Sequence, residues 1–457
     1  MTAHDARTAL SRLAQFAADL RLEDVPPPVI ERAHAVLRDT VGVILGGLQA
    51  PEVARLLDHA RAYHHGEARL LAHAGTVTPE WAALVYGTAG TTLEYDEGHA
   101  FARGHAAIHA VSVALALAGA DDTLSGTDCL LALLVGYEVA ARIGVATRLK
   151  PEVHPFGAWG VIGAAAVAGK IARLNGDEML ALFELAASYA ITPSFYTAFQ
   201  GKNVRNTYAG MVNHNGLLAL TMYQLGFEGE QDGVQTTFGA ILGDRFTPEA
   251  LTDVLGTRYE IMRGYFKPYS ACRYSHAAVD ATLAIREQIT LNAIEQVTVA
   301  TYDFAAKLNE PAPQTPLAAR FSIPYIVAAT LHDGDANAAS FTEEAIQREA
   351  VRDLARRITV IEAPPYTALL PDQRAARVSV ITREGQTISS EALGSKGDPD
   401  QPMSADELRT KFDTLASALP AEARAQLWEQ LGNLARLPKA ASLFAINRED
   451  EKQSTQT

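Results

Sequence analysis

The first half of the chain repeats apolar residues at helical spacing. Segments 29–46, 79–92 and 177–190 place apolar residues every three or four positions, which is the signature of one buried helix face. The segment 157–166 is dense in glycine and alanine, and such small residues let helix backbones approach closely. We therefore expect a succession of helices from residue 5 to about residue 246, with one tightly packed helix at its centre.

The pattern changes near Tyr265. Segments 296–302 and 357–361 are typical of strands, and 376–382 with 387–393 predict a hairpin in which Gly385 takes a positive-φ turn position. Helical patterns lie between them, at 276–288 and 340–355. After a loop at 394–399, Ser404 and Glu407 have the spacing of a helix-starting capping box. The polar tail 448–457 is expected to fray.

These patterns predict a mainly α protein. Residues 1–265 would form a large helical domain to which 405–457 return, and 266–404 would form a separate, smaller α+β domain.

Composition narrows the class of protein. The chain has 457 residues, 48% of them hydrophobic, and a net charge of −14, so it can bury a sizeable core and lacks the basic balance of a nucleic-acid binder. Apolar stretches such as 111–120 are too short to span a bilayer, and we see no signal peptide. Two distant cysteines, Cys129 and Cys272, fit a reducing compartment. We expect a cytoplasmic protein without membrane or nucleic-acid partners.

The segment 94–99, Glu-Tyr-Asp-Glu-Gly-His, holds the densest candidate chemistry. Arg103, His105 and His109 follow closely. The alternative is a solvated loop between helices, but the number of histidines favours a site with Asp96, His99 and His105 as candidates. A metal site is the minority interpretation, because no His-Glu-x-x-His spacing is present.

Three further segments carry candidates. His154 precedes the small-residue helix, where the helix dipole favours a neutral imidazole; a buried histidine bonded to backbone is the alternative. Arg205 could bind a carboxylate through its planar fork, or it could be a surface charge at a helix start. Lys267, Arg273 and His276 lie at the expected domain junction, where clefts tend to form, although a solvated linker would also explain them.

Other chemistry lacks support in the sequence. No Gly-x-Ser-x-Gly elbow accompanies a serine, and no glycine-rich phosphate loop follows a strand. Cys272 is better explained as a small buried residue than as a nucleophile. We expect no nucleotide, metal or other cofactor.

Taken in order, eight segments resemble motifs of the MmgE/PrpD family. They are 37–42, 96–99 with His105, 136–144, 154–157, 208–216, 266–276, 321–325 and 396–399. The resemblance implies an all-α domain made by both chain ends, an inserted α+β lid and a homodimer. It also implies a site between the domains lined by Asp96, His105, His154, His276 and Tyr325.

Three positions depart from the family pattern. Glu97 replaces the second acid of an Asp-Asp pair, Ala106 replaces a proline, and Arg205 stands where the family usually has lysine. A guanidinium stays protonated, so Arg205 can bind a carboxylate but is poorly suited to transfer a proton.

The resulting hypothesis is a cofactor-independent, dehydratase-like lyase acting on a small anionic di- or tricarboxylate. It would remove a proton from the carbon beside a carboxylate. Its catalytic residues would be Asp96, His105, His154 and Tyr325, and its substrate-binding residues His99, Arg205, Lys267, Arg273 and His276. The alternatives are an epimerase or isomerase of an amino- or imino-dicarboxylate, a decarboxylase, a non-catalytic binding protein, and a metal hydrolase using the 96–105 cluster.

Overall fold

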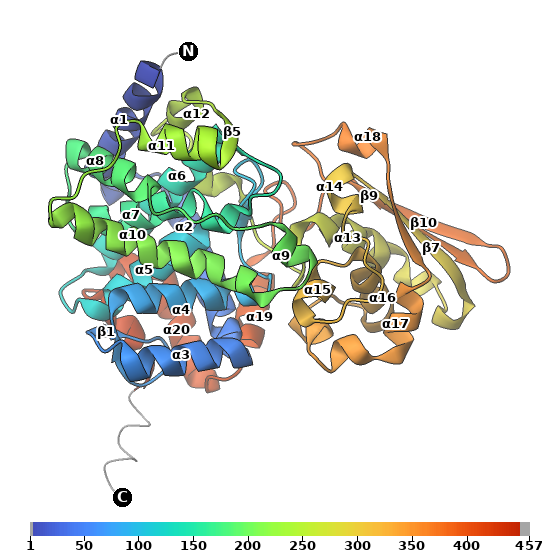
Figure 1. The fold of residues 1–457 in the computed structure, drawn as a ribbon. Coiled ribbons are helices and arrows are strands. Elements are labelled where there is room, and N and C mark those ends of the chain that lie inside the picture. Colours follow the sequence, from blue (N-terminus) through green and yellow to red (C-terminus); the bar gives the residue numbers. More distant parts are fainter. Residues whose placement is uncertain (1–2, 448–457) are drawn as a thin grey trace, which may run out of the picture.

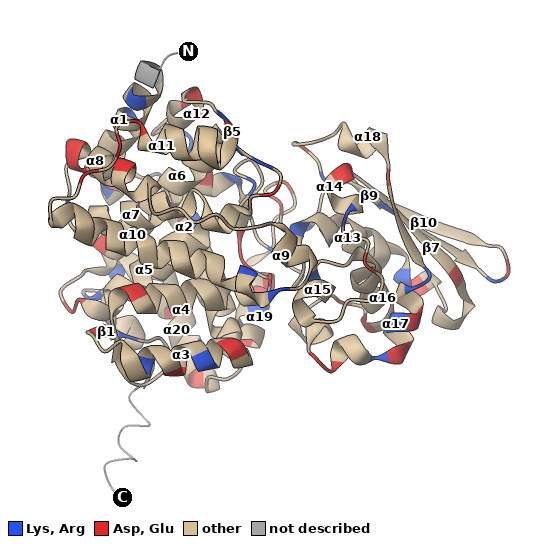
Figure 2. Ribbon diagram, viewed as in Figure 1, with Lys and Arg blue, Asp and Glu red and all other residues tan. Residues whose placement is uncertain are grey.

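The structure is a computed structural model that describes residues 3–447, so the tail 448–457 lies outside the description. The predicted mainly α fold is confirmed: a large helical body lies beside a smaller part that contains the main sheet (Figure 1). Acidic and basic positions are scattered over both parts (Figure 2).

The helical body is built from both ends of the chain. Its N-terminal helices are α1 (Ala3–Asp19), α2 (Pro27–Gly47), α3 (Pro51–Tyr63), α4 (Pro79–Thr92), α5 (Ala107–Ala120), α6 (Gly126–Ala146), α7 (Gly160–Ile171), α8 (Gly176–Ala187), α9 (Tyr196–Phe199), α10 (Tyr208–Gln224), α11 (Gly233–Gln235) and α12 (Glu249–Thr252). The C-terminal helices α19 (Ala405–Leu415) and α20 (Ala421–Gly432) return and pack against α2. Ser404 and Glu407 form the predicted capping box at the start of α19.

Small residues allow α6 and α7 to pack closely, as their density predicted. A Cβ added at Gly163 would lie 2.6 Å from the Cβ of Ala140 and 2.9 Å from the carbonyl oxygen of Gly136. Larger side chains would push the helices apart. The helix α6 is long and apolar enough to cross a membrane, but 89% of its apolar window is buried inside the protein, where it forms part of the core.

The smaller part is organised around a four-stranded sheet of order β10-β9-β7-β8. The strands are β7 (Ile294–Thr301), β8 (Ile358–Glu362), β9 (Ala376–Thr382) and β10 (Thr387–Ala392). β7 runs parallel to β8 and antiparallel to β9. The predicted hairpin joins β9 to β10, and Gly385 in its turn has φ +83.

Short helices surround this sheet. They are α13 (His276–Ile285), α14 (Asp303–Ala306), α15 (Pro316–Arg320), α16 (Ile323–Asp333), α17 (Glu349–Ala355) and α18 (Pro364–Thr367). The prediction of one helix over 340–355 was wrong, since only α17 is α-helical there. Thr342 has an extended backbone and its hydroxyl accepts a hydrogen bond from the backbone N–H of Ala345. Arg348 is also extended, with φ −60 and ψ 114, and it separates a short turn of helix at Ala345–Gln347 from α17.

Three two-stranded sheets complete the fold: β1 (Ala68–Arg69) with β2 (Thr76–Val77), β3 (Gly98–His99) with β6 (Gly264–Tyr265), and β4 (Thr147–Leu149) with β5 (Gly243–Phe246). The β3–β6 pair matters most for the site. It joins the 94–105 segment to the chain just before the junction.

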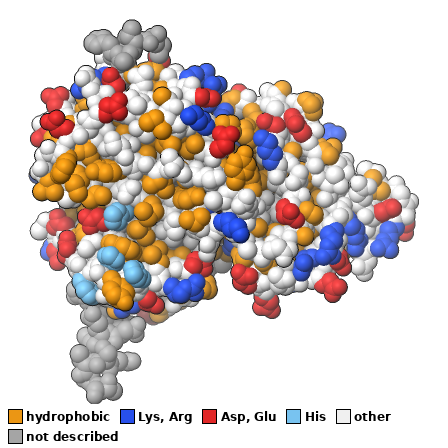
Figure 3. Space-filling view, viewed as in Figure 1, with side chains coloured by type: hydrophobic (Ala, Val, Ile, Leu, Met, Phe, Trp, Pro, Cys, Tyr) orange, Lys and Arg blue, Asp and Glu red, His pale blue; other side chains and the backbone are white. Residues whose placement is uncertain are grey.

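Two large hydrophobic cores divide the molecule. The first combines residues from the N-terminal helices with Phe412 to Phe444, and the second combines residues 269–380 with Ala198. The domain limits at 266 and 404 stay a prediction. Exposed apolar side chains gather on the face of the body seen in Figure 3, but the expected homodimer also stays a prediction.

Candidate active site

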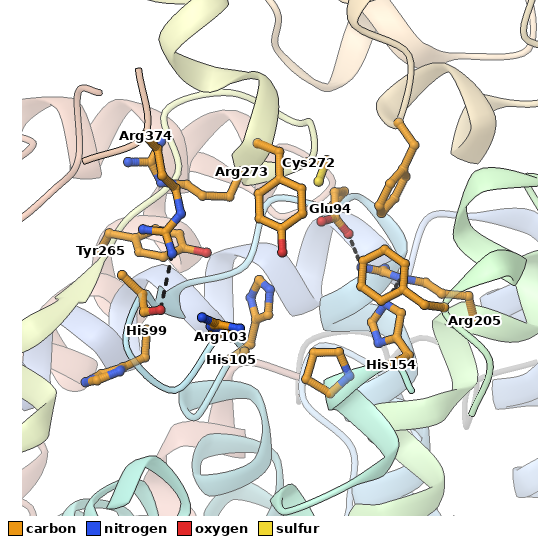
Figure 4. A pocket seen from close by; sticks show the side chains of 16 residues that line it. Glu94, His99, Arg103, His105, His154, Arg205, Tyr265, Cys272, Arg273 and Arg374 are labelled. Carbon is orange, nitrogen blue, oxygen red and sulfur yellow. Dashed lines mark hydrogen bonds and ion pairs between the residues drawn. The ribbon is translucent and has the colours of Figure 1, made fainter. Parts of the chain in front are cut away.

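A cavity that is partly open to solvent lies where the helical body meets the smaller part (Figure 4). Its wall combines side chains from both parts and holds far more cations than acids. The lining residues are Glu94, His99, Ala100, Arg103, Gly104, His105, His154, Pro155, Phe195, Arg205, Tyr265, Cys272, Arg273, Tyr274, Phe321 and Arg374.

The loop between α4 and α5 supplies the first group of these residues. Glu94 and Arg103 have φ +51 and +53, a region that costs a non-glycine residue on the order of 1–3 kcal/mol. The pairing of Gly98 with Tyr265 and a backbone bridge between His99 and Gly104 hold the loop in this conformation. The side chains of the loop are therefore aimed by a constrained backbone.

His105 and Asp96 form an imidazole–carboxylate pair in this loop. Nδ1 of His105 lies 2.9 Å from Oδ2 of Asp96 and 2.7 Å from the carbonyl oxygen of Glu97. Two acceptors at Nδ1 indicate that this nitrogen carries the proton, which leaves Nε2 for a ligand. Burial would raise the pKa of Asp96, but His105 and Lys267 outweigh it and lower the pKa overall. Asp96 is therefore ionised and orients a histidine suited to proton transfer.

Glu94 is the one acid on the described cavity wall, and two cations bind it. An Nη of Arg205 contacts Oε2 of Glu94, and Nζ of Lys267 lies 3.1 Å from Oε1. Burial opposes ionisation of Glu94, but Arg205 and Lys267 together lower its pKa. The three side chains are buried and form a network whose charges satisfy one another.

Arg205 is fixed in the cavity wall by contacts with several protein groups. Its other Nη donates to the carbonyl oxygen of Thr91 at 2.9 Å, and its guanidinium lies 4.6 Å from the ring centroid of Phe156. Separate hydrogen bonds to Glu94 and Thr91, together with the stacking on Phe156, explain why arginine suits this position better than the family's usual lysine would.

His154 lies next to Arg205. Its ring stacks on Phe195 with centroids 5.0 Å apart, and its Nε2 lies 3.4 Å from Nε of Arg205. Burial and then the positive charge of Arg205 hold the pKa of His154 well below its usual value. The histidine is therefore neutral, as predicted, although burial rather than a helix dipole is the main cause.

His99 lines the cavity, but the protein engages both of its ring nitrogens. Nδ1 accepts a hydrogen bond from the backbone N–H of Ala102 at 3.0 Å, and Nε2 lies 3.1 Å from Oε2 of Glu260. The imidazole thus lies between the loop backbone at Ala102 and the carboxylate of Glu260, where it anchors the loop.

Arg273 reaches the cavity from the smaller part. One Nη contacts Asp398, and the guanidinium lies 4.8 Å from the ring centroid of Tyr265. Its Nε and second Nη are buried without a hydrogen-bond partner. These free donors make Arg273 a candidate for binding an anion.

The remaining predicted residues do not line the cavity. Lys267 is buried behind the cavity wall. Its Nζ forms an ion pair with Glu94 and is 3.5 Å from Oδ1 of Asp96. Nε2 of His276 is 3.1 Å from the carbonyl oxygen of Ala271. The hydroxyl of Tyr325 donates to the carbonyl oxygen of Ser340 at 2.8 Å inside the second core. In this arrangement Lys267, His276 and Tyr325 do not reach the cavity, so they would not contact a substrate held in it.

Several wall residues were not among the sequence candidates: Glu94, Arg103, Tyr265, Tyr274, Phe321 and Arg374. Glu94 and Arg103 belong to the acid- and histidine-rich segment, so its density was a usable signal. Arg374 lies in the loop before β9 with no surrounding motif, and nothing in the sequence marks it.

Within residues 3–447, no group of three or more histidine, cysteine or acidic side chains is arranged to hold a metal ion. The thiol of Cys272 is buried, which raises its pKa to about 12. That shift disfavours a thiolate nucleophile.

Two family models and several curated proteins match this chain. Residues 11–244 match the family model of the MmgE/PrpD N-terminal domain, and residues 269–434 match that of the MmgE/PrpD C-terminal domain. A cis-aconitate decarboxylase of Aspergillus terreus is 26% identical over an alignment of 457 positions, and the alignment covers 92% of each chain. Those of Mus musculus and Homo sapiens are each 25% identical, covering 88% and 92% of this chain and 85% and 89% of their own.

Proposed function

The chain belongs to the MmgE/PrpD family of lyase-type enzymes, and from this premise we propose that it removes carbon dioxide from a small unsaturated tricarboxylate of the cis-aconitate kind. The reaction would need no cofactor, and His105 would transfer a proton at the carbon beside a second carboxylate. The observation that carries the proposal is the His105–Asp96 pair facing a wall with four arginines.

The charge of the cavity supports a multiply charged anion. Glu94 is matched by Arg205 and Lys267, so it does not repel an incoming carboxylate. Arg103, Arg273 and Arg374 add positive charge to the wall of a protein whose net charge is −14. Positive groups fixed in a partly closed cavity stabilise negative charge as it moves during a reaction.

Decarboxylation of such a substrate moves one electron pair through the double bond. The bond to the departing carboxylate breaks, its electrons form a new carbon–carbon double bond, and the old double bond takes up a proton at the carbon beside another carboxylate. His105, paired with Asp96 through Nδ1, would supply that proton from Nε2. A positioned acid of this kind contributes about 10²–10⁴-fold to the rate.

This assignment changes two expectations from the sequence. Dehydration ranked first there, whereas the relatives named above are decarboxylases, and decarboxylation now takes precedence. Tyr325 was one of the catalytic candidates, but its hydroxyl is bonded to Ser340, so His105 is the better proton donor. Dehydration of a hydroxy-tricarboxylate remains the second candidate, because the same pair could remove a proton from such a substrate.

The test is incubation of the protein with cis-aconitate and a panel of hydroxy-tricarboxylates in D₂O, followed by NMR. The proposal expects release of carbon dioxide and one deuterium in the product, at the carbon beside a carboxylate. His105→Ala should abolish both, while His65→Ala, which removes an exposed histidine, should not. Loss of water from the hydroxy acids without carbon dioxide release would favour the dehydratase.

A further inference from the structure

Arg273 carries two buried charged donors that no protein group satisfies. Its side chain is 5% exposed, one Nη is held by Asp398, and Nε and the other Nη have no hydrogen-bond partner. Leaving buried donors unpaired is costly, and the cost is larger for a charged group. The arrangement is explained if an anion in the cavity accepts those hydrogen bonds.

Two more arginines of the same wall lack an acidic partner. Across residues 3–447, no carboxylate oxygen lies within 4.0 Å of the guanidinium of Arg103 or Arg374. Arg374 donates to the carbonyl oxygen of Ala100 at 3.2 Å, which connects the smaller part to the loop of the helical body. Arg103 stands on that same loop, with φ +53.

The three arginines lie apart from Arg205. Figure 4 shows Arg273 and Arg374 together near Tyr265, on the side of the cavity opposite Arg205, with His105 between the two sides. Arg103 and Arg374 both lie near Tyr274. Arg205 already binds Glu94 and the carbonyl oxygen of Thr91, so the uncompensated positive charge is on the other side.

We propose that Arg103, Arg273 and Arg374 form a carboxylate-binding subsite for a group of the substrate that does not react, and that this subsite selects tricarboxylates over dicarboxylates. Planar guanidinium groups match a carboxylate with paired hydrogen bonds. Asp398 fixes Arg273, and the loops carrying Arg103 and Arg374 meet at Ala100. The subsite rests on the proposed function for its substrate class, but its binding can be measured without turnover.

The experiment is titration calorimetry with two anions that cannot react, propane-1,2,3-tricarboxylate and pentanedioate. They share a five-carbon chain and differ by the central carboxylate. We expect the wild-type protein to bind the tricarboxylate more tightly. Arg374→Ala and Arg103→Ala should each reduce that preference by ~10-fold, the scale of one charge-assisted contact.

Arg383→Ala is the matched control, since Arg383 is an exposed arginine on the same part of the chain and its loss should leave the preference unchanged. An equal loss of affinity for both anions in the Arg374 and Arg103 variants would show general charge attraction and overturn the subsite. Unchanged affinity would overturn it as well. Selective binding without turnover of any tricarboxylate would contradict the proposed function and would still support the subsite.

Discussion

Nδ1 of His105 lies 2.9 Å from Oδ2 of Asp96, while Asp96 is itself buried 3.5 Å from Nζ of Lys267. The carboxylate thus connects a buried cation to a histidine that reaches the cavity with 12% of its side chain exposed. Positive charge behind Asp96 keeps it ionised, and an ionised Asp96 fixes the imidazole. Orientation of the proposed proton-transfer residue therefore depends on a residue that does not touch the cavity.

Asp96→Asn should lower turnover by about 10²–10⁴-fold, because the imidazole loses the charge that orients it and stabilises its protonated form. The amide keeps the size of the side chain, and Lys267 still has Glu94 as a partner. Steady-state kinetics and thermal melting of the variant would check this. A melting temperature that falls as sharply as the activity would instead assign Asp96 a structural role.

Arg205→Ala should destabilise the fold by about 3–5 kcal/mol, the usual cost of removing one partner of a buried ion pair. Glu94 would keep only Lys267. Urea unfolding measures the change, with Lys202→Ala as the control because Lys202 is exposed three residues earlier. Arg205→Lys should recover part of the loss, and equal stability of all three variants would contradict the network.

Tyr325→Phe should leave turnover unchanged, because the hydroxyl of Tyr325 donates to Ser340 away from the cavity. Stability should fall by about 0.5–1.5 kcal/mol for the lost hydrogen bond. Rate measurements beside chemical unfolding separate the two effects. A tenfold loss of turnover with little change in stability would restore Tyr325 as a proton donor.

The sequence predicted much of the fold because the signals involved are local. Helical periodicity, the capping box at Ser404 and the hairpin turn at Gly385 each depend on neighbouring residues, and all three are present. The segment 340–355 differs from the prediction because extended backbone at Thr342 and at Arg348 interrupts an otherwise helical pattern.

The site was harder to predict because its chemistry depends on distant partners. Glu94 is explained by Arg205 and Lys267, which follow it by 111 and 173 residues. Tyr325 and Phe321 belong to one motif, yet Phe321 lines the cavity while Tyr325, one helical turn later, is bonded to Ser340. Residue types indicated candidate side chains, and only the fold shows which of them reach the cavity.

Glu97 is a buried carboxyl near the site, and it allows a test of how its protonation is linked to the stability of the fold. Its Oε1 accepts a hydrogen bond from the hydroxyl of Tyr137 at 2.5 Å, and burial raises its pKa to about 7 from 4.5. Below pH 4.5 the carboxyl is protonated in both folded and unfolded chains. Between pH 4.5 and 7 the unfolded chain loses the proton first, so the stability contributed by the neutral form is lost as pH rises.

Glu97→Gln should remove this dependence, since the amide cannot ionise and its oxygen can still accept from Tyr137. The slope of unfolding free energy against pH between 4.5 and 7 should become less negative by up to about 1.4 kcal/mol per pH unit, the effect of one proton. Urea unfolding at a series of pH values measures that slope. Glu287→Gln, which changes an exposed glutamate, should not alter it. If both variants keep the wild-type slope, Glu97 is ionised in the folded protein. Its carboxylate then adds one negative charge beside His105, contrary to what the burial of Glu97 implies.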